Sequence, residues 1–367
     1  MFATGRIPYR DGRASCGTSA GHLTASTERR SGPPQRAEDV TVGGGEARLG
    51  PVTSAPLRSG AMAFEEYVRS EIVADCAEGL LSRREALRRL MLLGVGAAAA
   101  GTLLAGCGDD SKKSDSASSS STAPSSSTTT AAGTAAPVGP APLATEAVTF
   151  AGPAGQLKGS WSAAPTAKGA VLIIHENQGL TAHFVTLPGR LAASGYSALA
   201  VDLLSRKGGT GAFTDPGAAT AALTGLPLPD LVADLRAGLD ELLRRAGGHK
   251  PGVMGFCFGG GLVWSLLAAG EARLAAACPF YGPLPDNHDF SKAKAAVLAF
   301  YGETDSRVDA TRDAAVAALE AAKLTHEIKV EPGAGHAFFN ETKPSYVPAA
   351  AADAYAALLD WFGRYLS

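Results

Sequence analysis

The sequence predicts an α/β fold in which a mostly parallel sheet carries helices on both faces. From Gly169 to the C-terminus, short apolar runs alternate with stretches of helical spacing. The run "AVLIIHE" is continuously apolar and rich in branched side chains, which is typical of a strand buried on both faces. The stretch "LPDLVADLRAGLDELLRRAGG" repeats leucine every three or four residues, as an amphipathic helix does. Regular alternation of such elements favours parallel strands joined by helices.

The remaining elements follow in chain order. "HFVTLPGRLAASG" predicts a helix that ends at Gly195, and "YSALAVDLL" predicts the next strand. The strand "KPGVMGFC" precedes the helix "GGGLVWSLLAAG", and "RLAAACPFYG" and "AAVLAFYGETD" are two further buried strands. We expect "DATRDAAVAALEAAK" to be a helix, "HEIKVEPG" a strand, and "YVPAAAADAYAALLDWFGRYL" the closing helix. No internal repeat is present.

The N-terminal third differs in composition from this domain. Residues 62–106 contain the pair Arg83-Arg84 before an apolar run, the arrangement of a twin-arginine export signal. The run ends in "LAGC", which resembles a lipoprotein cleavage site at which Cys107 becomes the lipidated first residue. A buried core helix and a single membrane span are the alternatives, but the run is short for a span. We therefore expect an exported protein, lipid-anchored at the outer face of the bacterial cell membrane.

Two other segments flank this signal. Residues 1–61 have no apolar periodicity, and we expect a non-native extension or a disordered stretch, with Met62 as an alternative start. Residues 107–143 are rich in Ser, Thr and Ala and cannot bury enough apolar surface to offset their ordering entropy. They predict a disordered tether to a folded domain over 144–367, whose size supports its own core.

Charge and cysteine content narrow the function classes. The net charge is −2, and no block of Lys or Arg lies in the folded part, so nothing suggests nucleic-acid binding. We expect a monomer. Of the five cysteines, only Cys257 and Cys278 belong to the predicted domain. In an exported protein this pair suggests a disulfide, although a domain of this size does not need one.

Cys257 lies in the pattern Gly255-Phe256-Cys257-Phe258-Gly259, at the point where a predicted strand gives way to a helix. This spacing is that of a nucleophile elbow with Cys in place of Ser. Side chains two residues on either side would collide with neighbouring backbone. The following helix directs its N-terminal N–H groups at the thiol, which favours a thiolate.

Two further residues complete a predicted triad. Asp305 follows the strand "AAVLAF", and His336 follows the strand "HEIKV". Ligand-facing residues of such sheets lie at the carboxyl ends of strands, and the chain order nucleophile, acid, base is the order of α/β-hydrolases. His336 would accept a proton from the thiol or from water, and Asp305 would hold its tautomer and orientation.

These segments resemble the dienelactone hydrolase family of the α/β-hydrolase fold. "GFCFGG", "YGETD" and "GAGHAFF" are similar to the nucleophile, acid and base segments of that family, and "HENQGL" with "LAASGYSALAVDLLSR" to its N-terminal half. The resemblance implies that Glu176 contacts the resting Cys257 and helps to control when the thiolate forms. It also implies an oxyanion hole made by the backbone N–H groups of Asn177 and Phe258.

The resemblance is incomplete at the substrate. Members that cleave dienelactone carry an arginine four residues beyond the catalytic histidine, where this sequence has Asn340. Dienelactone is therefore a doubtful substrate, and Arg206 is our candidate for a charge at the rim. Seven aromatic residues, Tyr281 among them, supply apolar bulk near the predicted mouth, and most of the seven are expected to be core.

The sequence thus predicts a hydrolase that cleaves a small ester or lactone through Cys257 and an acyl-enzyme, without a cofactor. The stretch "HENQGLTAH" offers His175, Glu176 and His183 as metal ligands, but it lacks the spacing of a helical zinc motif, so we expect no metal. A non-catalytic ligand-binding lipoprotein is one alternative. A thiol redox protein using Cys257 and Cys278 is another, although no C-x-x-C motif is present.

Overall fold

The computed structural model describes residues 66, 68–70, 72–73, 76, 81–105 and 136–367. Residues 136–367 contain one eight-stranded sheet in the order β1-β2-β4-β3-β5-β6-β7-β8. Strand β2 pairs antiparallel with both β1 and β4, and every other pairing is parallel. The strands are β1 Glu146–Gly152, β2 Gly155–Ser162, β3 Gly169–Ile174, β4 Tyr196–Asp202, β5 Pro251–Phe256, β6 Ala276–Phe280, β7 Ala296–Gly302 and β8 His326–Glu331.

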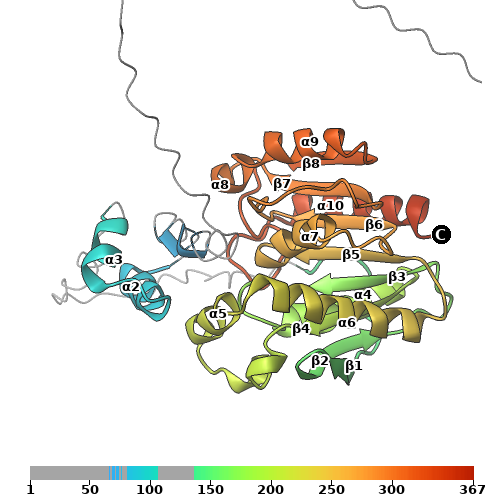
Figure 1. Cartoon of the computed structure of the whole chain (residues 1–367), viewed down its shortest axis with the longest axis horizontal. Helices are drawn as coiled ribbons and strands as arrows, with labels where there is room; N and C mark the ends of the chain where they lie inside the picture. Colours follow the sequence, from blue (N-terminus) through green and yellow to red (C-terminus); the bar gives the residue numbers. More distant parts are fainter. Residues whose placement is uncertain (1–65, 67, 71, 74–75, 77–80, 106–135) are drawn as a thin grey trace, which may run out of the picture. The chain divides into compact units, whose positions relative to one another are not determined.

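Helices cover both faces of this sheet (Figure 1). Helices α6 and α7 pack on one face. Helices α4 and α10 meet on the other, where the Tyr355 hydroxyl donates to the Arg190 carbonyl at 3.2 Å. The helices of this domain are α4 Ala182–Ala193, α5 Pro216–Thr224, α6 Leu228–Ala246, α7 Phe258–Ala268, α8 Ser306–Asp309, α9 Arg312–Ala321 and α10 Pro348–Tyr365. The predicted doubly covered, mostly parallel sheet is confirmed.

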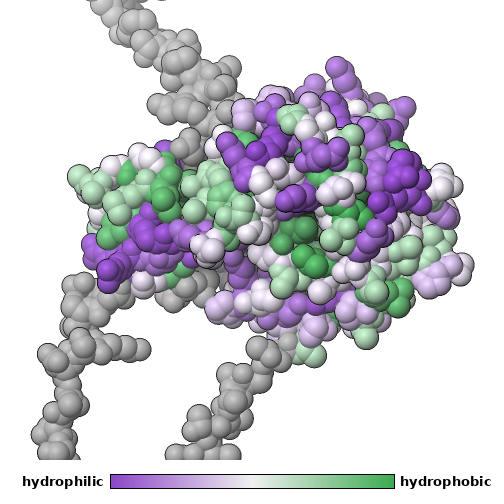
Figure 2. Space-filling model, turned by 90° about the horizontal axis from the view of Figure 1, so that it is seen from below, coloured by the Kyte–Doolittle hydropathy of each residue, from purple (hydrophilic) through white to green (hydrophobic). Residues whose placement is uncertain are grey.

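The central strands form the core because they have no polar face. Every residue of β3, β4, β5 and β7 is buried, as their continuous apolar sequences predict. In the hairpin at one edge of the sheet, β1 and the first half of β2 alternate exposed and buried residues instead, whereas the last four residues of β2 are all buried. On the face seen in Figure 2, hydrophilic and hydrophobic side chains are interspersed.

The strand order reverses at β3. Chain order runs from β3 to β4 on one side and then returns to β5 on the other side of β3. Open α/β sheets bind ligands in the crevice at such a switch point, beyond the carboxyl ends of the strands. The ends of β3 and β5 are therefore the place to look for a site.

In the segment predicted to be an export signal, the described residues 81–105 form two short helices, α2 Arg83–Leu92 and α3 Ala97–Leu103. Within the described part of the chain, no helix is both long and apolar enough to cross a membrane. Cys107, residues 1–61 and most of the predicted tether lie outside the described residues.

Candidate active site

Cys257 lies between the end of β5 and the start of α7, with a backbone φ of 53°. Such a left-handed conformation is unfavourable for a residue with a Cβ and marks a strained turn. A Cβ on Gly259 would lie 2.5 Å from the carbonyl oxygens of Ile174 and His175, and one on Gly255 would lie 2.3 Å from the Gly259 carbonyl oxygen. The glycines of the G-x-C-x-G pattern are therefore required by the close approach of backbone, as predicted.

His336 lies between the thiol and a carboxylate. Its Nδ1 is 2.5 Å from Asp305 Oδ2, and its side chain hydrogen bonds with Cys257. Burial alone lowers the pKa of His336, but the interactions with Asp305 and Cys257 outweigh burial, so the pKa rises well above its usual range. The three predicted triad residues are brought together in the predicted order.

Asp305 follows β7 and caps α8, where one carboxylate oxygen accepts from the Val308 N–H at 3.4 Å. Its side chain is 4% exposed. Burial raises the pKa of this carboxyl, but His336 outweighs burial, and the net shift is downward. Asp305 is thus held as a carboxylate that orients the imidazole.

Glu176 follows β3 at the switch point and is 4% exposed. Its carboxylate accepts from the Tyr281 hydroxyl at 3.3 Å and from the Asn340 side-chain amide at 3.0 Å, and Lys343 Nζ lies 4.0 Å away. Asn340, at the position where an arginine was expected, is 1% exposed and holds Glu176. Asn340, which departs from the family pattern, therefore holds the Glu176 carboxylate in place by a buried hydrogen bond.

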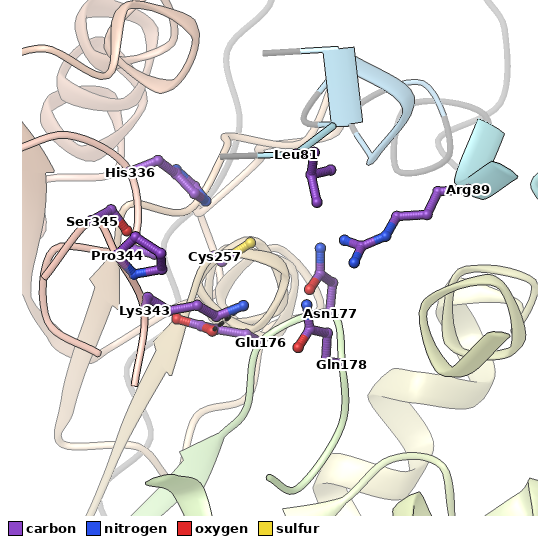
Figure 3. Close-up of a pocket in the computed structure, with 11 residues that line it drawn as sticks. Leu81, Arg89, Glu176, Asn177, Gln178, Cys257, His336, Lys343, Pro344 and Ser345 are labelled. Carbon is purple, nitrogen blue, oxygen red and sulfur yellow. Dashed lines mark ion pairs between the residues drawn. The ribbon is translucent and has the colours of Figure 1, made fainter. Parts of the chain in front are cut away.

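A pocket opens over Cys257 (Figure 3). In this view the thiol, His336 and Glu176 surround one space, with Asn177 beside it and Lys343 next to Glu176. Lys343 is the cation that the domain itself contributes to this lining. The lining residues are Leu81, Arg89, Glu176, Asn177, Gln178, Cys257, His336, Ala337, Lys343, Pro344 and Ser345.

Of the two residues predicted to supply the backbone donors of an oxyanion hole, one lines the pocket and the other directly follows Cys257. Phe258 is the first residue of α7, directly after the nucleophile. Asn177 lines the pocket from the segment after β3. The N-terminus of a helix favours a developing negative charge nearby.

Arg206 is a correction to the sequence prediction. It does not line the pocket. Its guanidinium is held by α6, with Nε 2.7 Å from Asp234 Oδ2 and Nη1 3.1 Å from Asp230 Oδ2. Asp234 is fully buried, so the positive charge of Arg206 compensates the negative charge of that carboxylate. Arg206 is therefore not a substrate-binding charge at the rim of the pocket.

Among the residues that sequence reasoning missed, two lie next to the Glu176 carboxylate. Tyr281 belonged to a group of aromatic residues most of which were expected to be core, and its ring is buried, but its hydroxyl reaches Glu176. Its position directly after β6, at the ligand-binding edge of the sheet, was a usable signal. Lys343 carried no such signal, because it lies seven residues beyond His336 in a loop whose path the sequence does not reveal.

The described residues do not support a metal site or a disulfide. His175 and His183 bond with Glu176 O and Glu341 respectively, and the described residues contain no group of three or more His, Cys, Asp or Glu able to hold a metal. Cys257 and Cys278 are thiols rather than a disulfide. Burial raises the pKa of Cys278 far above its usual range, so it is an unreactive core thiol.

The fold is that of an α/β-hydrolase, with Cys257 at the turn between β5 and α7, and comparison with known proteins identifies the family. The model of the dienelactone hydrolase family matches residues 159–366. The chain therefore belongs to the dienelactone hydrolase family, and it is a hydrolase of the ester- and lactone-cleaving kind.

Individual relatives agree with this assignment. A protein of Escherichia coli O157:H7 named "Putative carboxymethylenebutenolidase" is 33% identical over 208 residues, covering 53% of this chain and 76% of its own length. A protein of the same name from Methylorubrum extorquens is 33% identical over 209 residues, with 53% and 72% covered. A crystal structure of a "Putative Dienelactone Hydrolase" from Klebsiella pneumoniae is 30% identical, with a TM-score of 0.53, and covers 61% of this chain and 100% of that one.

Proposed function

We propose that the protein hydrolyses a small carboxylic ester or lactone through Cys257 as nucleophile, His336 as general base and acid, and Asp305 as the group that orients His336. The observation that carries this proposal is the single line of contacts from Asp305 through His336 to a thiol on a strained elbow. A non-catalytic binding protein would gain nothing from a nucleophile held in an unfavourable backbone conformation.

The proposed reaction has two steps. The Cys257 thiolate attacks the carbonyl carbon and forms a C–S bond, the C–O bond breaks, and the leaving alkoxide takes a proton from His336. Water then gives a proton to His336 and attacks the thioester, the C–S bond breaks, and the acid is released. The N–H groups of Asn177 and Phe258 would stabilise the oxyanion that forms in both steps.

Glu176 would control when the thiolate forms. Its carboxylate is held at the pocket by Tyr281 and Asn340. Two negative groups beside one another repel, so a charged Glu176 favours a protonated resting thiol. Movement of Glu176 on substrate binding would remove that repulsion and release the proton to His336.

The substrate is small and, we propose, carries a negative group near the carbonyl. With Leu81 and Arg89 in its lining, the pocket has a volume of about 170 Å³, which admits a small molecule. Lys343 Nζ is a partly exposed cation at its wall, with a side chain 29% exposed. An anionic substituent could pair with it in place of Glu176.

We also propose that the protein is exported and anchored through a lipidated Cys107, as a monomer. Among the described residues, five large apolar side chains are exposed. Three of them lie in α2 and α3 of the proposed signal, namely Met91, Leu92 and Leu103. Cleavage before Cys107 would also remove Leu81 and Arg89, leaving a pocket lined by the domain alone. Metabolic labelling with a fatty acid tests the lipid anchor, because the wild type should incorporate the label and C107A should not. Size-exclusion chromatography tests whether the protein is a monomer.

The catalytic proposal is tested by hydrolysis of p-nitrophenyl acetate by the full chain. C257A should lose at least about 10³-fold in kcat. C278A, the matched control in the core, should retain activity within about threefold because its thiol is unreactive. Full activity in C257A would overturn the proposal. A wild-type chain that binds small esters without cleaving them would favour the ligand-binding alternative.

A further inference from the structure

The backbone carbonyl of Glu176 is held by two donors beyond the end of β3. His175 Nδ1 lies 2.7 Å from this oxygen, and the Gly179 N–H donates to it at 3.2 Å. The His175 side chain is fully buried and does not line the pocket. These contacts are separate from those of the Glu176 carboxylate.

The other ring nitrogen of His175 determines which tautomer is present. The Leu203 N–H donates to His175 Nε2 at 3.1 Å, so Nε2 must be the unprotonated acceptor. Burial lowers the pKa of His175, which keeps the ring neutral despite the nearby carboxylate of Asp202. The single ring proton is therefore on Nδ1, and Nδ1–H donates to the Glu176 carbonyl.

This bond also sets the direction of the next N–H group. A trans peptide is planar, so the C=O of Glu176 and the N–H of Asn177 point in opposite directions. The described residues contain no cis peptide bond. Because the carbonyl is turned toward the buried ring, the N–H of Asn177 points away from that ring. Asn177 itself lines the pocket that contains Cys257 (Figure 3).

The same end of β3 touches the first turn of α7. Only the absence of a Cβ on Gly259 lets the carbonyls of Ile174 and His175 approach it so closely. The backbone of Ile174 and His175 is therefore held against the nucleophile elbow, and the next peptide, 176–177, is held through its carbonyl by His175 and Gly179. If this peptide flipped, a carbonyl oxygen would face the position where the oxyanion forms and would repel it.

We propose that His175 is a positioning residue that locks the 176–177 peptide with its N–H directed at the oxyanion. The inference rests on the proposed function, since it needs a reaction that passes through an oxyanion. His175 touches neither substrate nor thiol, and it acts through the peptide alone.

Two substitutions separate the two bonds of the ring. In His175→Asn the side-chain amide nitrogen takes the place of Nδ1 and can still donate to Glu176, while the bond with Leu203 is lost. In His175→Gln the amide oxygen reaches the place of Nε2 and can accept from Leu203, while the bond with Glu176 is lost. Each variant loses one buried hydrogen bond, so their melting temperatures should fall by similar amounts.

Two reactions of Cys257 supply the readouts in the full chain. Hydrolysis of p-nitrophenyl acetate passes through an oxyanion, whereas alkylation by iodoacetamide displaces iodide and forms none. Alkylation is followed by mass spectrometry of the peptide that contains Cys257. Loss of one oxyanion donor typically costs about 10²- to 10³-fold in kcat. Because Gly179 still holds the carbonyl, we expect a loss of at least about tenfold for H175Q.

We predict that H175Q loses kcat with an unchanged KM and an alkylation rate within about twofold of wild type, while H175N recovers most of the activity. Equal losses in both variants would overturn the inference, because packing alone would then account for the effect. A parallel loss of alkylation in H175Q would also overturn it, because the thiol itself would be impaired. If H175Q does not fold, a large loss of kcat in folded H175N overturns the inference.

Failure of the proposed function gives a different pattern. Hydrolysis that survives in C257A would overturn the thiol mechanism and, with it, this role of His175. An active wild type, an inactive C257A and full activity in H175Q would overturn the role of His175 alone.

Discussion

Replacing Glu341 with Gln should remove a stabilising charge cluster beneath the loop that follows His336. Glu341 Oε2 lies 2.6 Å from His183 Nδ1, and Oε1 lies 2.5 Å from Arg190 Nη2. Both partners belong to α4 and are almost completely buried, and the Glu341 side chain is 12% exposed. The cluster joins α4 to the loop that contains Asn340 and therefore supports the contact with Glu176.

The magnitude follows from the pKa of Glu341. Burial raises this pKa, but hydrogen bonds from His183 and Arg190 outweigh burial and lower it from 4.5 to about 2. A lowered folded-state pKa stabilises the fold above the unfolded value, and the stabilisation is lost as the pH falls toward the folded value. At about 1.4 kcal/mol per unit, the carboxylate contributes about 3 kcal/mol at pH 5 and about 1 kcal/mol at pH 3.

Urea unfolding of wild type and E341Q at several values between about pH 5 and pH 3 measures this contribution. The stability difference between the two proteins should shrink by about 2 kcal/mol over that range. E320Q, which removes an exposed carboxylate of α9, is the matched control and should show no such trend. A difference between wild type and E341Q that stays constant with pH would refute the reasoning, because the charge of Glu341 would then not stabilise the fold.

Three further predictions concern the site. Gly259→Ala would place a Cβ 2.5 Å from backbone carbonyls, so it should cost about 1–3 kcal/mol in urea unfolding and displace the elbow, whereas Gly211→Ala, which has open space, should cost much less. Asp305→Asn should lower kcat for an activated ester by about 10⁴-fold while the chain stays folded by circular dichroism; unchanged kcat would exclude Asp305 from the triad. Lys343→Gln should raise KM for an anionic ester by about tenfold relative to a neutral ester of equal size, and an equal change for both would exclude charge recognition.

The sequence was most informative where one physical constraint determined both composition and position. Buried parallel strands need continuous apolar runs, and all predicted strands from β3 to β8 are present. The elbow needs glycines at fixed spacing, so Cys257 was identified with its turn. Asp305 and His336 followed because a parallel sheet places the carboxyl ends of its strands at one edge.

Sequence-based prediction of the site failed where the position of a side chain depends on the path of a loop, because a loop has no hydrophobic periodicity from which that path could be inferred. Lys343 reaches the pocket from a loop whose sequence has no periodicity. Arg206 was wrongly assigned to the rim because its partner, Asp234, lies 28 residues away in a helix, and the sequence does not show that the two side chains meet. The hairpin strands β1 and β2 and the short helix α5 were not identified. Strand β1 and the start of β2 alternate exposed and buried residues over few positions, which is a weak signal in sequence.

The most direct test of the thiol mechanism is to trap the acyl-enzyme. The full chain is mixed with p-nitrophenyl acetate, quenched in acid within the first turnover, digested and analysed by mass spectrometry. We predict an acetyl group on the peptide that contains Cys257, formed as p-nitrophenol is released. In H336A, once the thiol has been acetylated, we predict that the acetyl group persists longer than in the wild type because its hydrolysis is slower. Release of p-nitrophenol by the wild type with no acetyl group on Cys257, or with one on another residue, would contradict this mechanism.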